Sequence, residues 1–186
     1  MSKTGQNGTI GIFQSIKALT LAAMLTAMSV AIGIFCKNFM DFGGGLFRIT
    51  FENLPILLSG IMFGPVVGGI VGLTTDIVSY LLSGQIFPLN FIVTIGAASI
   101  GIVSGFFSKY IFIKKNTLGI VFSCVFAHIL GSLIIKPIGL FAYYGWAVLW
   151  RIPIYLFAIA PLEIFLICML YRNSYVRKFI YNVKEK

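Results

Sequence analysis

Charged residues are scarce in this chain of 186 residues: they make up 10% of it, and only five are acidic. A soluble domain of ordinary composition carries about 25% charged residues. Hydrophobic residues reach 59%, and the mean hydropathy is +0.99. This balance excludes a typical water-soluble domain and predicts a protein that lies in a membrane.

Motifs for catalysis, cofactor binding and metal binding are also missing. The sequence contains no GxxxxGK[ST] phosphate loop, no HExxH and no GxSxG. A single histidine excludes a His-rich metal site, and the isolated cysteines Cys36, Cys124 and Cys168 indicate no disulfide framework. We therefore expect a protein that is not an enzyme, with no catalytic residues, no cofactor and no metal.

The apolar residues occur in runs, each long enough or nearly long enough to cross a bilayer. About 20 helical residues span the hydrocarbon layer. The runs predict six helices, at Lys17–Phe35, Phe51–Phe63, Pro65–Leu82, Phe91–Tyr110, Leu118–Ile135 and Leu149–Tyr171. We expect an all-α membrane protein folded as a compact bundle of six transmembrane helices. The second run is short and ends at Gly64-Pro65, where we expect a broken or tilted helix.

The net charge of +9 predicts the orientation of these helices. If the N-terminus is cytoplasmic, ten basic residues lie inside and four lie outside: Lys37, Arg48, Lys136 and Arg151. This asymmetry places both termini in the cytoplasm of a multi-pass protein of the cell membrane. The excess of positive charge then marks the cytoplasmic side of the membrane. We expect membrane lipid, and no nucleic acid, as a partner.

The same pattern divides the chain into three parts. Residues 1–16 are expected to be a flexible cytoplasmic N-terminus, and residues 17–172 a six-helix transmembrane substrate-binding domain. Residues 173–186 are expected to be a basic cytoplasmic tail.

Glycine recurs at four-residue spacing in the second and third predicted helices, at Gly60, Gly64, Gly68 and Gly72. Ala97, Gly101 and Gly105 repeat the pattern in the fourth. Small residues at this spacing share one helix face and let two backbones approach closely. We interpret both stripes as internal helix crossings.

The first predicted helix carries a similar alanine pattern, with Ala18 and Ala22 on one line and Ala23, Ala27 and Ala31 on another. Two interpretations stay open from the residues alone. The alanines could pack inside this protein's own bundle, or they could contact a separate membrane subunit.

Asp76, His128 and Glu163 lie well inside predicted spans, away from their ends, where a charge is costly. From the helical rise, Asp76 lies roughly 9 Å and His128 roughly 10 Å below the outer face, whereas Glu163 is roughly 18 Å deep. We expect Asp76 and His128 to share an outward-facing cavity that Glu163 does not reach. For each of the three, an internal hydrogen bond or ion pair is the alternative interpretation.

Cations, aromatic residues and one amide gather at the predicted outer rim. They are Arg48, Asn53, Lys136, Tyr143, Tyr144, Trp146, Trp150 and Arg151. Tyrosine and tryptophan are expected at any membrane interface. Together with the cations they also suit a flat, anionic ligand, because aromatic rings stack and Arg or Lys pairs with carboxylates. Glycines 43–45 would let the adjacent loop act as a lid.

The segment from Arg48 to Leu82 resembles the substrate-binding S components of energy-coupling-factor (ECF) vitamin transporters. The shared pattern is Arg48-Ile49, then Pro55, then GxxFGPxxGxxxGxxxD from Gly60 to Asp76. Ala23 and Ala27 resemble the motif by which S components contact a transmembrane T subunit. The resemblance therefore favours docking for these alanines and implies, as partners, a T subunit and two cytoplasmic ATPase subunits.

The C-terminal half is most similar to the folate-specific branch of that family, with His128, Lys136, Arg151 and Glu163 in the matching stretch. The resemblance implies capture of folate from outside for ATP-driven uptake. We expect Asp76 near the ring, and Arg48, Lys136 or Arg151 near the carboxylates. Another vitamin or a pterin- or purine-like ligand stays open, as does a small membrane assembly protein without a transport role.

Overall fold

The computed structural model describes residues 16–42, 47–84, 88–111 and 117–174, and this part of the chain is almost entirely helical. The α-helices are α2 (Ile16–Phe39), α3 (Asn53–Phe63), α4 (Pro65–Leu82), α5 (Phe91–Phe106), α6 (Thr117–Ala127), α7 (Lys136–Tyr144), α8 (Arg151–Ile154) and α9 (Ala160–Arg172). A two-stranded antiparallel hairpin, β1 (Asp41–Phe42) with β2 (Phe47–Arg48), joins α2 to α3. The prediction of an all-α protein is confirmed, and only this hairpin departs from it.

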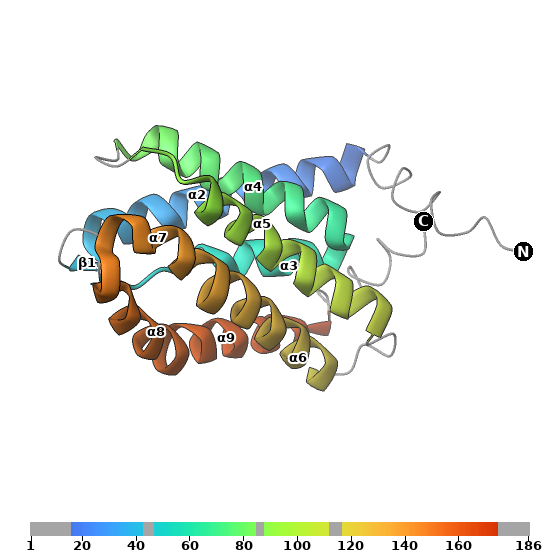
Figure 1. The fold of residues 1–186 in the computed structure, drawn as a ribbon. Helices are drawn as coiled ribbons and strands as arrows, with labels where there is room; N and C mark the ends of the chain where they lie inside the picture. Colours follow the sequence, from blue (N-terminus) through green and yellow to red (C-terminus); the bar gives the residue numbers. More distant parts are fainter. Residues whose placement is uncertain (1–15, 43–46, 85–87, 112–116, 175–186) are drawn as a thin grey trace, which may run out of the picture.

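Within the described residues, four shorter helical segments follow directly on α-helices. Three are π-helical: η1 (Phe107–Ile111), η2 (His128–Ile135) and η4 (Tyr155–Ile159). The fourth, η3 (Gly145–Trp150), is a 3₁₀-helix. The chain reverses direction at Gly145, whose φ of 55° favours glycine, so residues 117–144 and 151–172 form two antiparallel arms (Figure 1).

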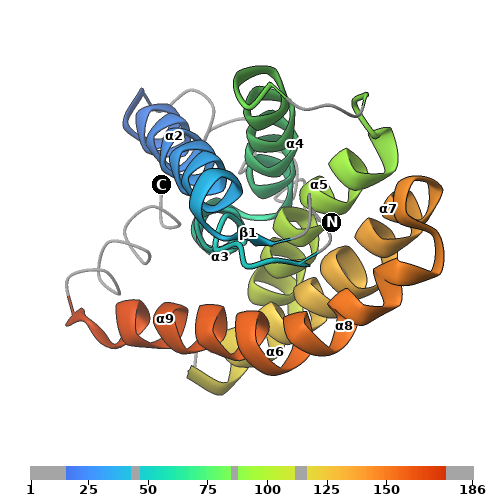
Figure 2. The same cartoon turned by 90° about the vertical axis from the view of Figure 1, so that its left-hand side faces the viewer.

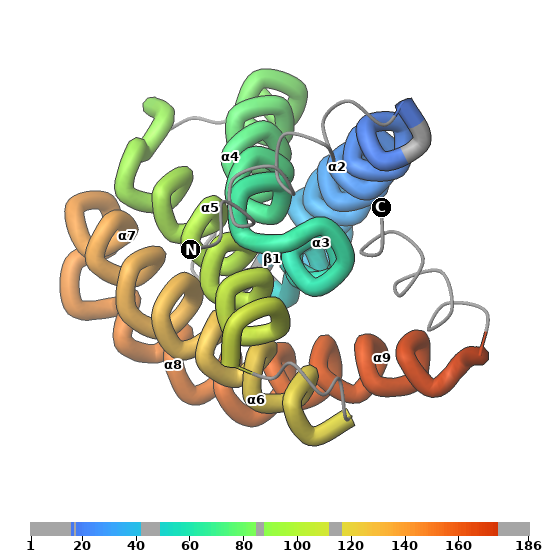
Figure 3. The backbone as a smooth tube through the Cα atoms, turned by 90° about the vertical axis from the view of Figure 1, so that its right-hand side faces the viewer, coloured from blue at the N-terminus to red at the C-terminus, as the bar shows by residue number. Residues whose placement is uncertain are grey.

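Helix α3 lies in the middle of the bundle, with α2, α4, α5 and α9 around it (Figures 2 and 3). It breaks from α4 at Gly64, whose φ is 93°, and Pro65 then starts α4. The predicted break at Gly64-Pro65 is confirmed. The short second predicted helix, Phe51–Phe63, therefore corresponds to α3, which its neighbours enclose.

The outer surface of the bundle is apolar, whereas its interior contains many small polar residues. Four segments are long and apolar enough to cross a membrane: Ala18–Phe39, Pro65–Leu82, Phe91–Ile111 and the doubled-back Thr117–Arg172. Buried hydroxyls such as Ser59 and Ser123 donate to backbone carbonyls of their own helices. This arrangement is that of a multi-pass membrane protein.

The glycine stripes meet where α3, α4 and α5 cross. A Cβ atom added at Gly68 would lie 2.5 Å from the carbonyl oxygen of Gly101 and 2.7 Å from the Cα atom of Gly60. One added at Gly105 would lie 2.5 Å from the carbonyl carbon of Gly64. Backbones that approach this closely leave no room for a side chain, so the predicted internal crossing is confirmed.

Adjacent glycines of α4 provide a matched test of this crossing. Gly68→Ala should destabilise the protein by about 2 kcal/mol, because the added methyl group meets the rigid backbones of α3 and α5. Gly69→Ala should cost less than about 1 kcal/mol, because its methyl group meets the Ile102 side chain, which can move. Thermal unfolding in detergent measures the difference. Equal destabilisation by both variants would contradict the close crossing.

One predicted helix end is wrong. The sequence suggests that Lys136-Pro137 ends the fifth run, but the helix continues through α7 to Tyr144. The π-helical turns of η2 precede Pro137, and Pro137 stands in the first turn of α7, where its missing N–H is tolerated. Residues 136–148, which lie between the fifth and sixth predicted helices, are therefore helical.

Candidate ligand pocket

A cavity opens at the end of the bundle that carries the β1–β2 hairpin. It has a volume of about 670 Å³, including space open to solvent. Side chains from α2, the segment before α3, and α3, α4, α5, η2, α7, α8 and η4 line it. They are Lys37, Thr50, Glu52, Asn53, Asp76, Val93, Ser132, Lys136, Pro137, Leu140, Arg151, Ile152 and Tyr155. The start of α2 and the end of α9 lie at the opposite end of the bundle (Figure 1).

The segment that enters α3 is pinned against α2. Ser29 donates a 2.5 Å hydrogen bond to the carbonyl oxygen of Glu52, and the backbone N–H of Glu52 donates to Thr50 Oγ1. The carboxylate of Glu52 lies close to α2 because residue 33 is glycine: a Cβ there would be 2.8 Å from Glu52 Oε2. These contacts hold Glu52 and the adjacent Asn53 at the pocket wall.

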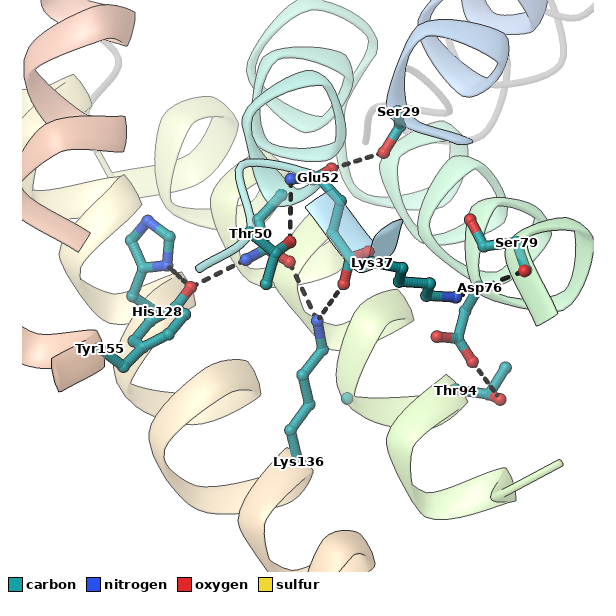
Figure 4. A network of polar contacts seen from close by, with 12 residues as sticks. Ser29, Lys37, Thr50, Glu52, Asp76, Ser79, Thr94, His128, Lys136 and Tyr155 are labelled. Atoms are coloured by element: carbon teal, nitrogen blue, oxygen red, sulfur yellow. Dashed lines mark hydrogen bonds and ion pairs between the residues drawn. The ribbon is translucent and has the colours of Figure 1, made fainter. Parts of the chain in front are cut away.

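Lys136 places a positive charge between these two residues. Its Nζ atom donates to Asn53 Oδ1 at 3.0 Å and lies 3.6 Å from Glu52 Oε1 (Figure 4). The side chains of Lys136 and Glu52 are 14% and 11% exposed, so this ion pair is largely shielded from water. The stem of Lys136 passes beside Gly96, where a Cβ would lie 2.8 Å from its Cγ.

A second set of polar groups forms the wall on the α4 side. Thr94 Oγ1 donates a 2.6 Å hydrogen bond to Asp76 Oδ2. Lys37 Nζ donates to the carbonyl oxygen of Ser79 at 3.3 Å and to Ser83 Oγ at 2.9 Å, which ties the end of α2 to the last turn of α4. A cation near helix C-terminal carbonyls is electrostatically favourable. The pocket thus combines three cations, Lys37, Lys136 and Arg151, with two acids.

Tyr155 connects the pocket to the interior. Its hydroxyl lies 2.8 Å from Asn53 Nδ2 and 2.9 Å from His128 Nδ1. On the far side of the imidazole, His128 Nε2 lies 3.4 Å from Glu163 Oε2. His128 and Glu163 are 2% and 0% exposed, so both lie behind the wall rather than in it.

The structure brings four of the nine predicted ligand-binding residues together at the pocket: Asn53, Asp76, Lys136 and Arg151. Four others are described but do not line it: His128, Tyr143, Tyr144 and Trp146. Tyr143 instead donates to the carbonyl oxygen of Pro88, and Trp146 is 76% exposed at the outer surface. The side chain of Arg48 and glycines 43–45 lie outside the described residues.

The predicted depths of the buried ionisable residues are wrong in one respect. His128 does not share the cavity with Asp76 and instead contacts Glu163, from which it was expected to be separate. The depth of His128 was counted from a helix end at Ile135. Because that helix continues to Tyr144, His128 lies deeper and reaches the level of Glu163.

Five polar residues that line the pocket were not predicted: Lys37, Thr50, Glu52, Ser132 and Tyr155. Glu52 could have been found, because it is one of only five acids and lies directly beside Asn53. Tyr155 could have been found from its spacing, since it follows Arg151 by four residues on a helix. Thr50 and Ser132 give no signal in the sequence.

Helix α2 presents its two alanine lines to different surroundings. Ala18 and Ala22 are buried against the bundle, whereas Ala23, Ala27 and Ala31 are exposed on the outer surface. The exposed line therefore makes no internal helix crossing within the described residues. It forms a smooth strip on the outside of α2, which we call the alanine strip.

Comparisons with known proteins agree with this architecture. A relative named folate transporter FolT, from Clostridium novyi (strain NT), is 30% identical over 97 residues, covering 50% of this chain and 55% of that protein. The uncharacterized MG098 homolog of Mycoplasma pneumoniae is 31% identical over 98 residues, covering 53% of this chain and 20% of that protein. The match thus spans about half or less of the length of either relative.

A solved structure shares the fold. The crystal structure of FolT bound with folic acid superposes with a TM-score of 0.60, covering 82% of this chain and 90% of that one at 21% identity. The family model for the substrate-specific component of ECF transporters matches residues 17–180. Because this match spans most of the sequence, the chain belongs to the family of ECF transporter substrate-specific components.

Proposed function

We propose that this chain captures folate at the outer face of the cell membrane and delivers it for ATP-driven uptake. The observation that carries the proposal is the pocket itself, where Lys37, Lys136 and Arg151 face Glu52 and Asp76. Folate joins a flat pterin that carries N–H groups to a glutamate tail with two carboxylates. Cations suit the carboxylates, and acids suit the N–H groups.

Within this proposal the two sides of the pocket have different roles. Lys136 and Arg151 pair with the glutamate carboxylates, and Asp76, already held by Thr94, accepts N–H groups of the pterin. Lys136 donates one N–H to Asn53 and pairs with Glu52, and in this proposal the rest of its ammonium donates to the ligand. The names of FolT from C. novyi and of the solved FolT–folic acid structure support folate as the ligand.

The proposed orientation follows from the two ends of the bundle. We propose six spans, formed by α2, α3, α4, α5 with η1, the arm 117–144 and the arm 151–172. The pocket then opens outward, and the start of α2 and the end of α9, at the opposite end, are cytoplasmic. The excess of basic residues in the segments assigned to the cytoplasm supports this orientation.

The alanine strip is the proposed docking surface for a transmembrane T subunit. Its small side chains face away from the bundle, where they allow another helix to approach closely. Two cytoplasmic ATPase subunits would complete the importer and supply the ATP hydrolysis, because this chain has no phosphate-binding loop of its own. In this assembly the chain binds substrate and catalyses no reaction.

Uptake of labelled folate tests the proposed transport role. Cells that express this chain together with ECF T and ATPase subunits should accumulate folate, and depletion of ATP should stop uptake. Omission of the ATPase subunits should have the same effect. Uptake that persists without ATP but collapses when an ionophore is added would contradict the proposal and indicate a secondary carrier.

A further inference from the structure

Five polar side chains form an unbroken series of contacts from the pocket to the interior of the bundle. Lys136 Nζ lies 3.0 Å from Asn53 Oδ1, and Asn53 Nδ2 lies 2.8 Å from the hydroxyl of Tyr155. That hydroxyl lies 2.9 Å from Nδ1 of His128 (Figure 4). Nε2 of His128 lies 3.4 Å from Oε2 of Glu163. We call these residues the polar chain.

The chemistry of its members gives the polar chain a direction. A lysine ammonium can only donate, so the amide of Asn53 must present its oxygen to Lys136 and its NH₂ group to Tyr155. The oxygen of Tyr155 therefore accepts from Asn53, and in the proposed arrangement its hydroxyl hydrogen is directed to Nδ1 of His128. With Nδ1 as acceptor, a neutral imidazole carries its proton on Nε2.

Glu163 ends the polar chain as its final acceptor. Among the described residues, Nε2 of His128 makes no hydrogen bond of ordinary geometry, so the carboxyl group of Glu163 at 3.4 Å is the acceptor available to it. Both residues are almost completely buried, so this contact is shielded from bulk water. Lys136 thus donates to Asn53 and Asn53 to Tyr155, and Nε2 of His128 lies within 3.4 Å of the Glu163 carboxyl group at the α9 end of the polar chain.

We propose that Glu163 is a positioning residue for the ligand pocket, which it does not line. Through its 3.4 Å contact with His128 and its interaction with Asn53, it fixes the direction of the polar chain, holds the oxygen of Asn53 toward the pocket and keeps Lys136 in place at the wall. This inference rests on the proposed function, in that Lys136 is the residue that meets the ligand.

Removal of the Glu163 carboxyl group should reverse the direction of hydrogen-bond donation along the polar chain. Without Glu163, the N–H at Nε2 of His128 would face apolar helices, so the tautomer with its proton on Nδ1 is favoured. That proton is directed to the oxygen of Tyr155, whose hydroxyl then turns to Asn53. In the proposed arrangement the amide of Asn53 flips to accept it, and its NH₂ group then faces the ammonium of Lys136, where both are donors.

The tautomer of the histidine tests the proposal without any ligand. The chain contains one histidine, so NMR of the full protein labelled with ¹⁵N-histidine reports on His128 alone. The wild type and Glu163→Gln, which retains an acceptor oxygen, should carry the proton on Nε2. Glu163→Leu should carry it on Nδ1. A wild type with its proton on Nδ1, or an unchanged tautomer in Glu163→Leu, would overturn the proposal.

Folate affinity tests whether Glu163 acts through Lys136. Glu163→Leu should weaken binding about tenfold, and Glu163→Gln less than about twofold, in an otherwise unchanged protein. In a Lys136→Met background, Glu163→Leu should cause no further loss. An equal loss in both backgrounds, or no loss in either, would show that Glu163 does not position Lys136.

These measurements separate the two proposals. If the folded wild-type protein binds no folate, the proposed function fails, and the tautomer measurement still decides the direction of the polar chain. If folate binds but the tautomer does not respond to Glu163→Leu, the positioning role fails and the proposed function stands.

Discussion

We expect Lys136→Met to weaken folate binding by about 100-fold, or about 2.7 kcal/mol. Methionine retains most of the length and the apolar stem, so the change removes the charge without leaving a large cavity. The loss has two parts. A charge-assisted contact to the ligand disappears, and Glu52, 3.6 Å from Nζ in the wild type, loses its ion-pair partner beside the ligand carboxylates.

The second part of this loss can be measured separately. Adding Glu52→Gln to Lys136→Met removes the acid that Lys136 pairs with in the wild type and should recover about tenfold of the affinity. Lys109→Met is the matched control, because Lys109 lies in η1, outside the pocket, and contacts the ring of Tyr110. Isothermal titration calorimetry on the purified proteins measures all three variants. Affinity within threefold of wild type for Lys136→Met would contradict the role of this lysine.

We expect Ala27→Trp to abolish assembly with the proposed T and ATPase subunits and to leave folate binding within about twofold of wild type. Ala27 lies on the exposed alanine strip of α2, so a large ring there does not disturb the bundle. It does prevent the close approach of a partner helix. Co-purification of the ATPase subunits with the tagged chain measures assembly, and calorimetry measures folate binding.

Ala158→Trp is the control for this variant. Ala158 is also an exposed alanine in a helical segment, η4, but it lies outside the alanine strip. This variant should co-purify with its partners at the wild-type level. Assembly that survives Ala27→Trp, or is lost equally in both variants, would show that the alanine strip is not the docking surface.

The helical architecture could be predicted because local patterns determine it. Hydrophobic runs of near-membrane length predict helices, and glycines at four-residue spacing predict the close crossing of α3, α4 and α5. The break at Gly64-Pro65 follows from the chemistry of proline. The continuation of α6 through Pro137 to Tyr144 could not be predicted, because a π-helical segment accommodates the proline and its formation depends on tertiary packing.

The pocket could be predicted only in part. Asn53, Asp76, Lys136 and Arg151 stand out in the sequence as polar groups near or within apolar runs, and the structure places them together. The error at His128 came from an assumed helix end, which shifted its depth by two and a half helical turns. Contacts such as Lys136 with Glu52, 84 positions apart, depend on how helices cross and have no local signal.

Direct binding of folate to the purified chain tests the central claim. Equilibrium dialysis against a panel of vitamins, including folate, riboflavin, biotin and thiamine, requires no partner subunit. The account predicts saturable binding of folate at one site per chain, with the other vitamins bound at least about 100-fold more weakly. Tight binding of another vitamin, with none of folate, would contradict it.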